Sequence, residues 1–322
     1  MRKLLVVLLG ALSLVACGGP AEEAGGDETV GGEVAGPVGP PPTFLPAASK
    51  VRMRLDMARV RRSETGPDIS SAIRATETWQ QLAGSSGLDP VADVDAVLVG
   101  ADGLYAERRT VVLRHPHTDA ELRDRVMQMA MARGAQAVWT EVDGIATTPL
   151  PIDLRVEHTL LLTASHEVVI TPTDDVARVV EIALDHRARR TSPEEIIEPN
   201  LALAAGEILT ASIEDPPARE GYPTPPRVMH VAATEDEASA RVILQVMADF
   251  ATEADAVAAR SYFEGQGQYY AQQLMVRAIG MHRPIEAARW TQAGEHLEVT
   301  TDLTQDEVRR VLGLMALSQM TQ

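Results

Sequence analysis

Residues 109–133 read RTVVLRHPHTDAELRDRVMQMAMAR and hold the pattern from which the fold can be predicted. An apolar run ends at Leu113, and Thr118 with two acidic residues follows it. Beyond them, apolar residues recur three and four positions apart, which is typical of a helix with one apolar face. Thr118 and Glu121 form a capping-box pair, in which each side chain accepts a hydrogen bond from the other residue's backbone N–H. We therefore predict a strand followed by an amphipathic helix that ends near residue 133.

The same order of strand, threonine, acidic residues and helix recurs around Thr173, Thr252 and Thr304. Short polar or glycine-containing turns pair the strands into hairpins across 96–113, 160–171 and 228–247, and the proline-rich stretch 215–226 is predicted to be a loop between strands. This arrangement predicts an α+β fold, with antiparallel sheets covered on one face by amphipathic helices. The stretch 163–180 resembles 291–312, which favours a duplicated unit over a chance recurrence of simple patterns.

Composition divides the chain into four segments. Residues 1–16 are a positively charged start and an apolar run, too short to span a bilayer as a stable helix. Residues 17–50 are rich in Gly, Pro and acids, so we expect a disordered tether. From residue 51 the apolar residues become periodic, and we expect a first α+β unit over 51–190 and a second over 191–322, joined through 187–200.

The apolar run ends in Leu14, Val15, Ala16 and Cys17, and Cys17 is the single cysteine of the chain. This segment resembles the lipobox of bacterial lipoproteins. The resemblance implies cleavage by signal peptidase II and acylation of Cys17, which then anchors the chain to a membrane. An aspartate directly after the cysteine would resemble an inner-membrane retention signal. This chain has Gly18 at that position, which favours sorting to the outer membrane. The alternatives are an ordinary signal peptide with an incidental cysteine and a soluble protein with a free thiol.

The chain is strongly acidic. Its formal charge is −17, and removal of residues 1–16 leaves 27 basic and 46 acidic side chains, a formal charge of −19. Such a charge disfavours nucleic-acid binding. Lys50 is the only lysine left after that cleavage, so lysine chemistry has one candidate, at the end of the tether. A body without cysteine has no disulfides and no thiolate metal sites.

Several groups of polar residues could carry chemistry, but none matches a complete motif. They are His115 with His117, His158 with His166 and Glu167, the aspartates Asp89, Asp93, Asp95 and Asp102, and the turn residues Ser85 and Ser86. The histidine spacing lacks a completing ligand, the aspartates do not follow the EF-hand pattern, and the serines do not stand in a Gly-x-Ser-x-Gly elbow. We therefore predict no metal site, no cofactor and no catalytic residue.

A short motif resembles one found in uncharacterised envelope lipoproteins of Gram-negative bacteria: Gly87-Leu88-Asp89-Pro90 followed by Asp93-Val94-Asp95. The resemblance covers about a dozen residues and implies no activity. The densest aromatic group, Tyr262, Phe263, Tyr269 and Tyr270, is the candidate contact site for a partner or ligand, with core packing as the alternative. We expect a non-catalytic module that binds a protein of the cell envelope. The alternatives are a carrier of an apolar ligand or lipid, recognisable by a cavity beside Tyr262 and Met275, and a hydrolase with an unrecognised site.

Overall fold

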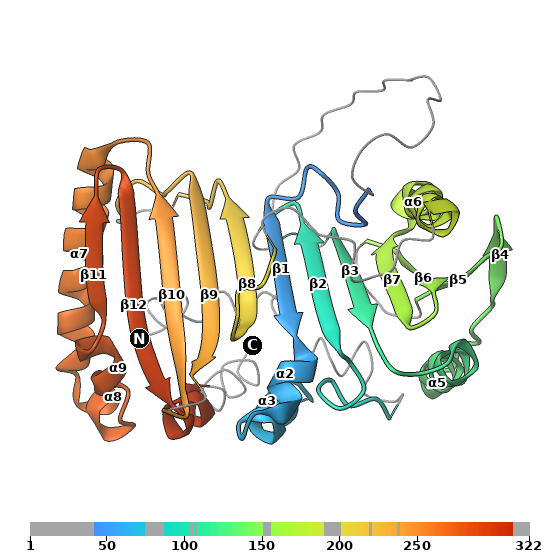
Figure 1. Cartoon of the computed structure of the whole chain (residues 1–322), viewed down its shortest axis with the longest axis horizontal. Helices are drawn as coiled ribbons and strands as arrows, with labels where there is room; N and C mark the ends of the chain where they lie inside the picture. Colours follow the sequence, from blue (N-terminus) through green and yellow to red (C-terminus); the bar gives the residue numbers. More distant parts are fainter. Residues whose placement is uncertain are drawn as a thin grey trace.

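A single antiparallel sheet runs through the whole body of the protein. The structure, a computed structural model, describes residues 42–74, 87–103, 106, 108–150, 156–189, 201–218, 221–236 and 239–311. Over these residues twelve strands pair in the order β11-β12-β10-β9-β8-β1-β2-β3-β7-β6-β5-β4 (Figure 1). The predicted α+β class with antiparallel pairing is confirmed, and the predicted units share one sheet.

The strands are β1 (Val51–Asp56), β2 (Ala96–Ala101), β3 (Arg109–Arg114), β4 (Thr140–Val142), β5 (Ile145–Pro149), β6 (His158–Ala164), β7 (Glu167–Pro172), β8 (Glu207–Glu214), β9 (Val228–Asp236), β10 (Arg241–Asp249), β11 (Arg289–Ala293) and β12 (His296–Thr304). The helices are α2 (Met57–Arg62), α3 (Gly66–Arg74), α5 (Asp119–Ala132), α6 (Val176–Arg189), α7 (Glu253–Ala271), α8 (Leu274–Ala278) and α9 (His282–Glu286), with a 3-10 turn η1 (Thr173–Asp175) before α6. Residues 305–311 are also helical.

The strand order reveals an internal repeat. From the centre outward the first half runs β1-β2-β3-β7-β6 and the second half runs β8-β9-β10-β12-β11. Along the chain, a helix follows the third of these strands in both halves: α5 follows β3, and α7 follows β10. A second helix follows the last strand of each half in the sequence: α6 follows β7, and the helical residues 305–311 follow β12. The halves join where β1 pairs with β8, with Met53 opposite Ala211. This matching order is the pattern that a duplicated unit produces.

One face of the sheet is apolar along its whole width. Because side chains alternate between faces along a strand, the strand register identifies its residues. A single row runs across the sheet on this face, through Leu160, Ile170, Val111, Val99, Met53, Ala211, Val231, Val246 and Val299. Helix α5 packs on this face in the first half through Leu122 and Val126, and α7 packs on it in the second half through Ala256 and Ala259.

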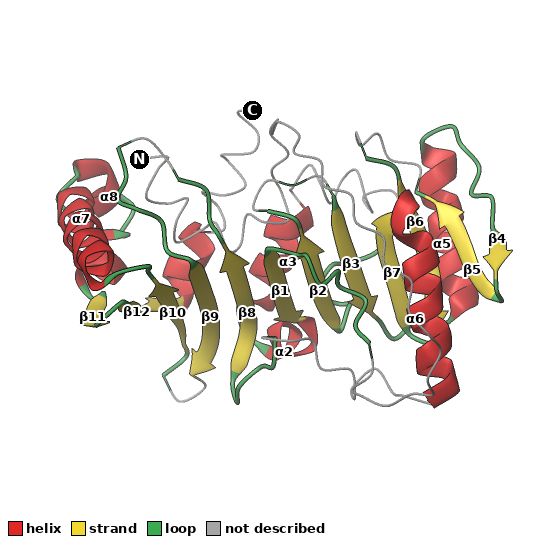
Figure 2. Cartoon of the chain, turned by 90° about the horizontal axis from the view of Figure 1, so that it is seen from above, coloured by secondary structure: helices red, strands yellow, loops and turns green. Residues whose placement is uncertain are grey.

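The opposite face differs between the halves. In the first half its row is apolar, with Leu98, Val112, Val169 and Leu161, and α6 packs on it through Val179 and Ala183. Helices therefore lie on both faces there (Figure 2). In the second half the row continues through Thr210, Ala232, Gln245 and Thr300, three of them polar, and no described helix packs on it. The predicted single covered face thus applies to the second half alone.

The packed body begins earlier than the predicted end of the tether at residue 50. Phe44 and Leu45 are each only 2% exposed and belong to the core beneath α6. Their segment is held through its carbonyls, because Arg178 donates to Phe44 O at 2.9 Å and Arg52 donates to Ala47 O at 2.8 Å. The physical reason is that burial of these two large apolar side chains offsets the conformational entropy lost in ordering the segment. Residues 42–50 belong to the fold, so the boundary predicted at 50/51 is corrected.

Candidate partner-binding surface

The four aromatic residues proposed as a contact site lie on α7, but they do not form one surface. The ring centroid of Tyr262 lies 5.5 Å from that of Tyr222 and 5.2 Å from that of Phe263. Phe263 in turn packs against the core between α7 and the sheet. Burial raises the pKa of the Tyr262 hydroxyl, with smaller contributions from Tyr222 and Tyr270. This geometry makes Tyr262 and Phe263 packing residues.

The other two aromatics lie at the C-terminal end of α7. The ring centroids of Tyr269 and Tyr270 are 5.4 Å apart, and Tyr269 is 58% exposed. Two residues outside the predicted contact site follow them: Leu274 is 83% exposed, and Met275, named above only as a neighbour of an expected cavity, is 60% exposed. These values are high for large apolar side chains, and the three residues are close in sequence.

The surface lies within a stretch that carries no charge. Residues 265–276 read GQGQYYAQQLMV, twelve residues without Asp, Glu, Lys or Arg in a chain that is 23% charged. We call this stretch the uncharged window. At its borders Glu264 pairs with Arg260 at 3.5 Å and Arg277 pairs with Glu286 at 3.6 Å. A contact on the window therefore requires no desolvation of an ion from within it.

The backbone directs the apolar side chains of the window outward. Helix α7 ends at Ala271, which is buried, and the short helix α8 begins at Leu274. Val276 is buried against Met281 and Val311, so it fixes α8 to the body. With Ala271 and Val276 directed inward, Leu274 and Met275 are left on the solvent side.

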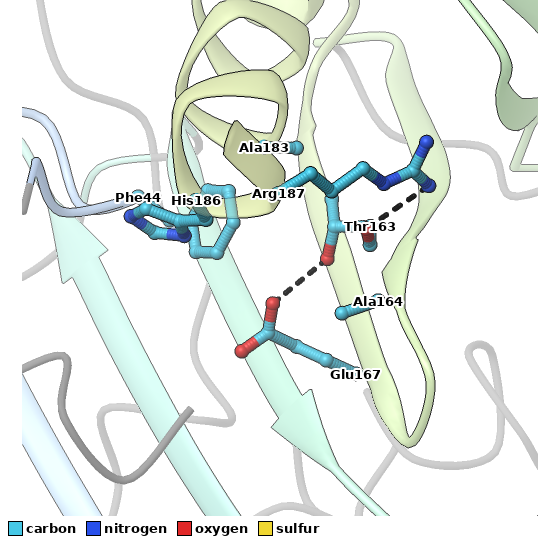
Figure 3. Close-up of a pocket in the computed structure, with 7 residues that line it drawn as sticks. All are labelled: Phe44, Thr163, Ala164, Glu167, Ala183, His186 and Arg187. Atoms are coloured by element: carbon cyan, nitrogen blue, oxygen red, sulfur yellow. Dashed lines mark hydrogen bonds between the residues drawn. The ribbon is translucent and has the colours of Figure 1, made fainter. Parts of the chain in front are cut away.

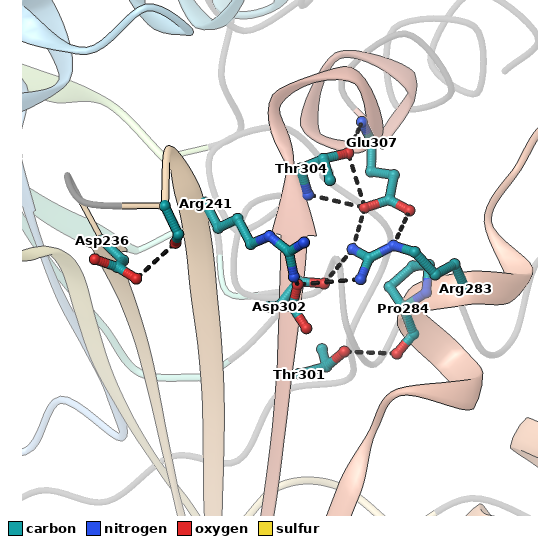
Figure 4. A network of polar contacts seen from close by, with 9 residues as sticks. Asp236, Arg241, Arg283, Pro284, Thr301, Asp302, Thr304 and Glu307 are labelled. Carbon is teal, nitrogen blue, oxygen red and sulfur yellow. Dashed lines mark hydrogen bonds and ion pairs between the residues drawn. The ribbon is translucent and has the colours of Figure 1, made fainter.

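A network of ion pairs holds the helical segment that carries α8. Arg283 of α9 donates through Nε to Glu307 at 2.7 Å and through Nη1 to Asp302 at 3.0 Å, and a second bond joins Arg283 Nη2 to Glu307 (Figure 4). Arg241 of β10 also donates to Asp302, at 2.5 Å. Thr301 donates to the Pro284 carbonyl at 2.5 Å. Together these bonds fix α9 to the end of β12.

A cavity of about 210 Å³ lies in the other half of the protein, between α6 and the β6–β7 hairpin. It is lined by Phe44, Thr163, Ala164, Glu167, Ala183, His186 and Arg187 (Figure 3). This cavity is therefore not the one expected of a carrier beside Tyr262 and Met275.

Four of the side chains that line this cavity are polar, the kind of convergence that a hydrolase would need. Their polar atoms bond to the protein itself. The Thr163 hydroxyl donates to Glu167 at 2.9 Å, His186 Nε2 lies 2.6 Å from Pro42 O, and Arg187 donates to two carbonyls. These bonds join α6, the hairpin and the segment at residue 42, a structural use of the same groups.

The histidines considered as metal ligands are partly brought together. His115, His117 and His166 form one cluster, with the His115 ring centroid 6.1 Å from each of the other two. His158 lies apart, with Nδ1 at 2.8 Å from Val156 O, and burial lowers its pKa. Among the described residues, no three His, Cys, Asp or Glu side chains are arranged to hold a metal ion.

The aspartates near residue 90 organise their own loop. Asp89 Oδ1 accepts from the backbone N–H groups of Val91 and Ala92, each at 2.8 Å, and Asp95 pairs with Arg61 at 2.9 Å. Asp93 accepts from the Asp89 N–H at 2.8 Å. Lys50 Nζ lies 3.5 Å from Asp215. Asp102 lies 3.9 Å from Arg108. Cys17, Ser85 and Ser86 lie outside the described residues.

Solved structures of one protein, TP0453, are among those that resemble the chain. Crystal forms I and IV of TP0453 match with TM-scores of 0.45 at 10% identity, and crystal form III matches with 0.41 at 9%. The alignment with form I covers 83% of this chain and 94% of the TP0453 chain. No family model and no curated protein matches the sequence. None of the helices that the structure describes has both the length and the apolar composition needed to span a bilayer.

Proposed function

We propose that the protein is a lipid-anchored, non-catalytic module of the cell envelope, which binds a protein partner through the uncharged window. The observation that carries this proposal is the exposure of Tyr269, Leu274 and Met275 at 58%, 83% and 60% within twelve residues free of charge. Interface centres are depleted of charged residues and enriched in Tyr and Met. Exposed contiguous apolar side chains with a polar border mark interaction sites on soluble domains.

The support of the window is as important as its composition. Val276 and the Arg283 network hold α8 and α9 against the sheet, so the apolar side chains are presented on an ordered backbone. An ordered surface loses less conformational entropy on binding than a flexible one. Anchoring belongs to the proposal through the resemblance of residues 14–17 to a lipobox, which implies acylation of Cys17, and Gly18 favours an outer-membrane location.

The alternatives have weaker support. A carrier of apolar ligands requires a cavity with an apolar lining, whereas four of the seven residues around the cavity at α6 are polar. A hydrolase requires an accessible nucleophile beside a base. The Thr163 hydroxyl does donate a hydrogen bond to the Glu167 carboxylate in that cavity, but Thr163 is 1% exposed and Glu167 is 2% exposed, so the pair is buried. The non-catalytic interpretation therefore remains our proposal.

The test is a comparison of two variants with matched exposure. Met275 at 60% and Met131 on α5 at 58% are equally exposed methionines in opposite halves of the sheet. We expect Leu274→Gln with Met275→Gln to lower the amount of the co-purified envelope partner at least tenfold, with Met131→Gln at the wild-type level. Surface changes of this kind alter stability by about 0.5 kcal/mol or less, so both variants stay folded. Equal retention of the partner by both variants would contradict the proposal.

A further inference from the structure

Three histidines meet where β3, the start of α5 and the β6–β7 turn come together. His115 follows β3, His117 precedes α5, and His166 lies in the turn. The rings of His115 and His117 are stacked with an interplanar angle of 19°, and the ring of His166 is tilted by 63° from that of His115. The cluster thus joins three segments that are separate in the sequence.

The central ring is buried without hydrogen bonds. His115 is 4% exposed, and neither of its ring nitrogens has a hydrogen-bond partner in the part of the chain that the structure describes. A neutral imidazole tolerates this site better than an imidazolium, because burial of an unpaired charge is costly. The junction is therefore compatible with His115 in its neutral form.

The junction also depends on backbone contacts through the same residues. The His115 N–H donates to His166 O at 3.1 Å, and His166 Nδ1 lies 3.0 Å from His117 O. His166 has a φ of 66°, a left-handed conformation that is rare for residues other than glycine. A strained residue holds the turn against the start of α5.

The charged groups around the cluster are few. Asp119 is the acidic group that acts on His115, while Asp93 Oδ1 lies 3.2 Å and Glu121 Oε2 lies 3.9 Å from a ring nitrogen of His117. Arg114, the residue before His115, lies 3.9 Å from Glu167 of β7. If all three rings were charged, three nearby carboxylates would face them, and two of these carboxylates lie beside His117. The charged rings would also lie at the N-terminus of α5, where cations are unfavourable.

We propose that this cluster is a pH-sensitive latch, in which the neutral imidazole of His115 lets the β6–β7 turn lie on the start of α5 and its protonation on acidification releases the two from each other. Release would uncover the apolar side chains of α5 and the sheet beneath it, Leu122, Val126, Leu160 and Leu162 among them. The latch is independent of the proposed partner surface, which lies in the other half of the sheet.

The direction of the pH effect follows from the same geometry. Burial, and then the like charges of His117 and His166, lower the pKa of His115 from 6.5 to about 4. A released His115 regains its ordinary pKa, so the released form binds protons more readily than the latched form. The latch is therefore strongest above pH 6.5, and each pH unit between 6.5 and 4 shifts the equilibrium toward release by at most about tenfold, or about 300-fold in all.

The chain provides its own reporter. Trp139 packs against the apolar core between α5 and the sheet, and the Arg123 guanidinium lies 4.9 Å from its ring centroid. Trp290 packs against the core beneath α7, in the other half of the sheet. We would label the full chain with 5-fluorotryptophan, assign the resonances with Trp139→Phe and Trp290→Phe, and record fluorine NMR spectra from pH 7.5 to 4.5.

We expect the Trp139 resonance to change between pH 6.5 and 4.5 while the Trp290 resonance stays constant. His115→Asn should move the midpoint down by at least one pH unit, and the control His230→Asn, on the uncovered face of β9, should leave it unchanged. If His115→Asn does not fold, the second variant is His166→Asn, at an exposed position. Its amide N–H can donate to His117 O in place of the ring Nδ1, while the like charge that acts on His115 is removed, so the midpoint should also fall. Simultaneous change of the Trp139 and Trp290 resonances, or a wild-type midpoint in both the His115 and His166 variants, would overturn the proposal.

Discussion

Replacement of Arg283 by glutamine removes the cation at the centre of the network that fixes α9 to β12. Glu307 is 4% exposed and accepts two bonds from Arg283, so the change leaves a buried carboxylate without its cation. Loss of one partner of a buried ion pair costs about 3–5 kcal/mol. The Arg283 side chain is 36% exposed, and solvent screening therefore reduces the expected loss to about 2 kcal/mol.

Urea unfolding at pH 7, followed by circular dichroism, measures this loss. With an m-value of about 3 kcal/mol/M, the unfolding midpoint of Arg283→Gln should fall by about 0.7 M. The matched control is Arg260→Gln, since Arg260 pairs with Glu264 on the exposed surface of α7 and should contribute less than about 0.5 kcal/mol. Equal shifts for the two variants would refute the reasoning from burial.

Acid should reduce the contribution of the network. Burial alone would raise the pKa of Glu307, but the hydrogen bonds from Arg283 and Thr304 outweigh it, so the pKa lies below the ordinary value of 4.5. A carboxyl group with a lowered pKa stabilises the fold above its ordinary value, and this stabilisation is lost as the pH falls through the folded value. The difference between wild type and Arg283→Gln should therefore be constant above pH 5 and shrink below pH 4.5.

Three further outcomes are expected. Thr118→Ala removes the capping box of α5, in which Glu121 N donates to the Thr118 hydroxyl at 3.3 Å, and should lower the free energy of unfolding by about 1 kcal/mol, while Thr118→Ser should restore most of it. Phe44→Ala should cost about 3 kcal/mol in urea unfolding, because the ring is 2% exposed, and a loss below 1 kcal/mol would return residues 42–50 to the tether. Cys17→Ser should abolish acylation in intact-mass spectra, and an unmodified Cys17 in the wild-type chain would contradict the proposed anchor.

The local elements were predictable because their signals are local. The hairpins β2–β3, β6–β7 and β9–β10 follow from apolar runs around short turns, and α5 begins at its predicted cap. The union of both units in one sheet was not predictable, because it depends on the pairing of β1 with β8. That pairing joins residues more than 150 positions apart, and no turn between the strands specifies it.

Other features that we did not predict were nevertheless indicated by the sequence. Leu160-Leu161-Leu162 and Val168-Val169-Ile170 are unbroken apolar runs, which are typical of strands buried on both faces and therefore indicate the second helix layer at α6. The stretch 42–50 looked like tether because Pro and Ala outnumber its two large apolar residues. Aromatic density pointed to α7, but the exposed positions Leu274 and Met275 were marked instead by the absence of charge over 265–276.

Site-specific photo-crosslinking in intact cell envelopes tests the central claim most directly. A photoreactive phenylalanine analogue at position 274 probes the uncharged window, and the same analogue at position 131 probes an exposed site in the other half of the sheet. The account predicts a discrete protein adduct at 274 that is absent at 131 and that disappears when Tyr269→Ser and Met275→Gln are added. Adducts of equal intensity at both positions, or adducts at 274 with lipid alone, would contradict it.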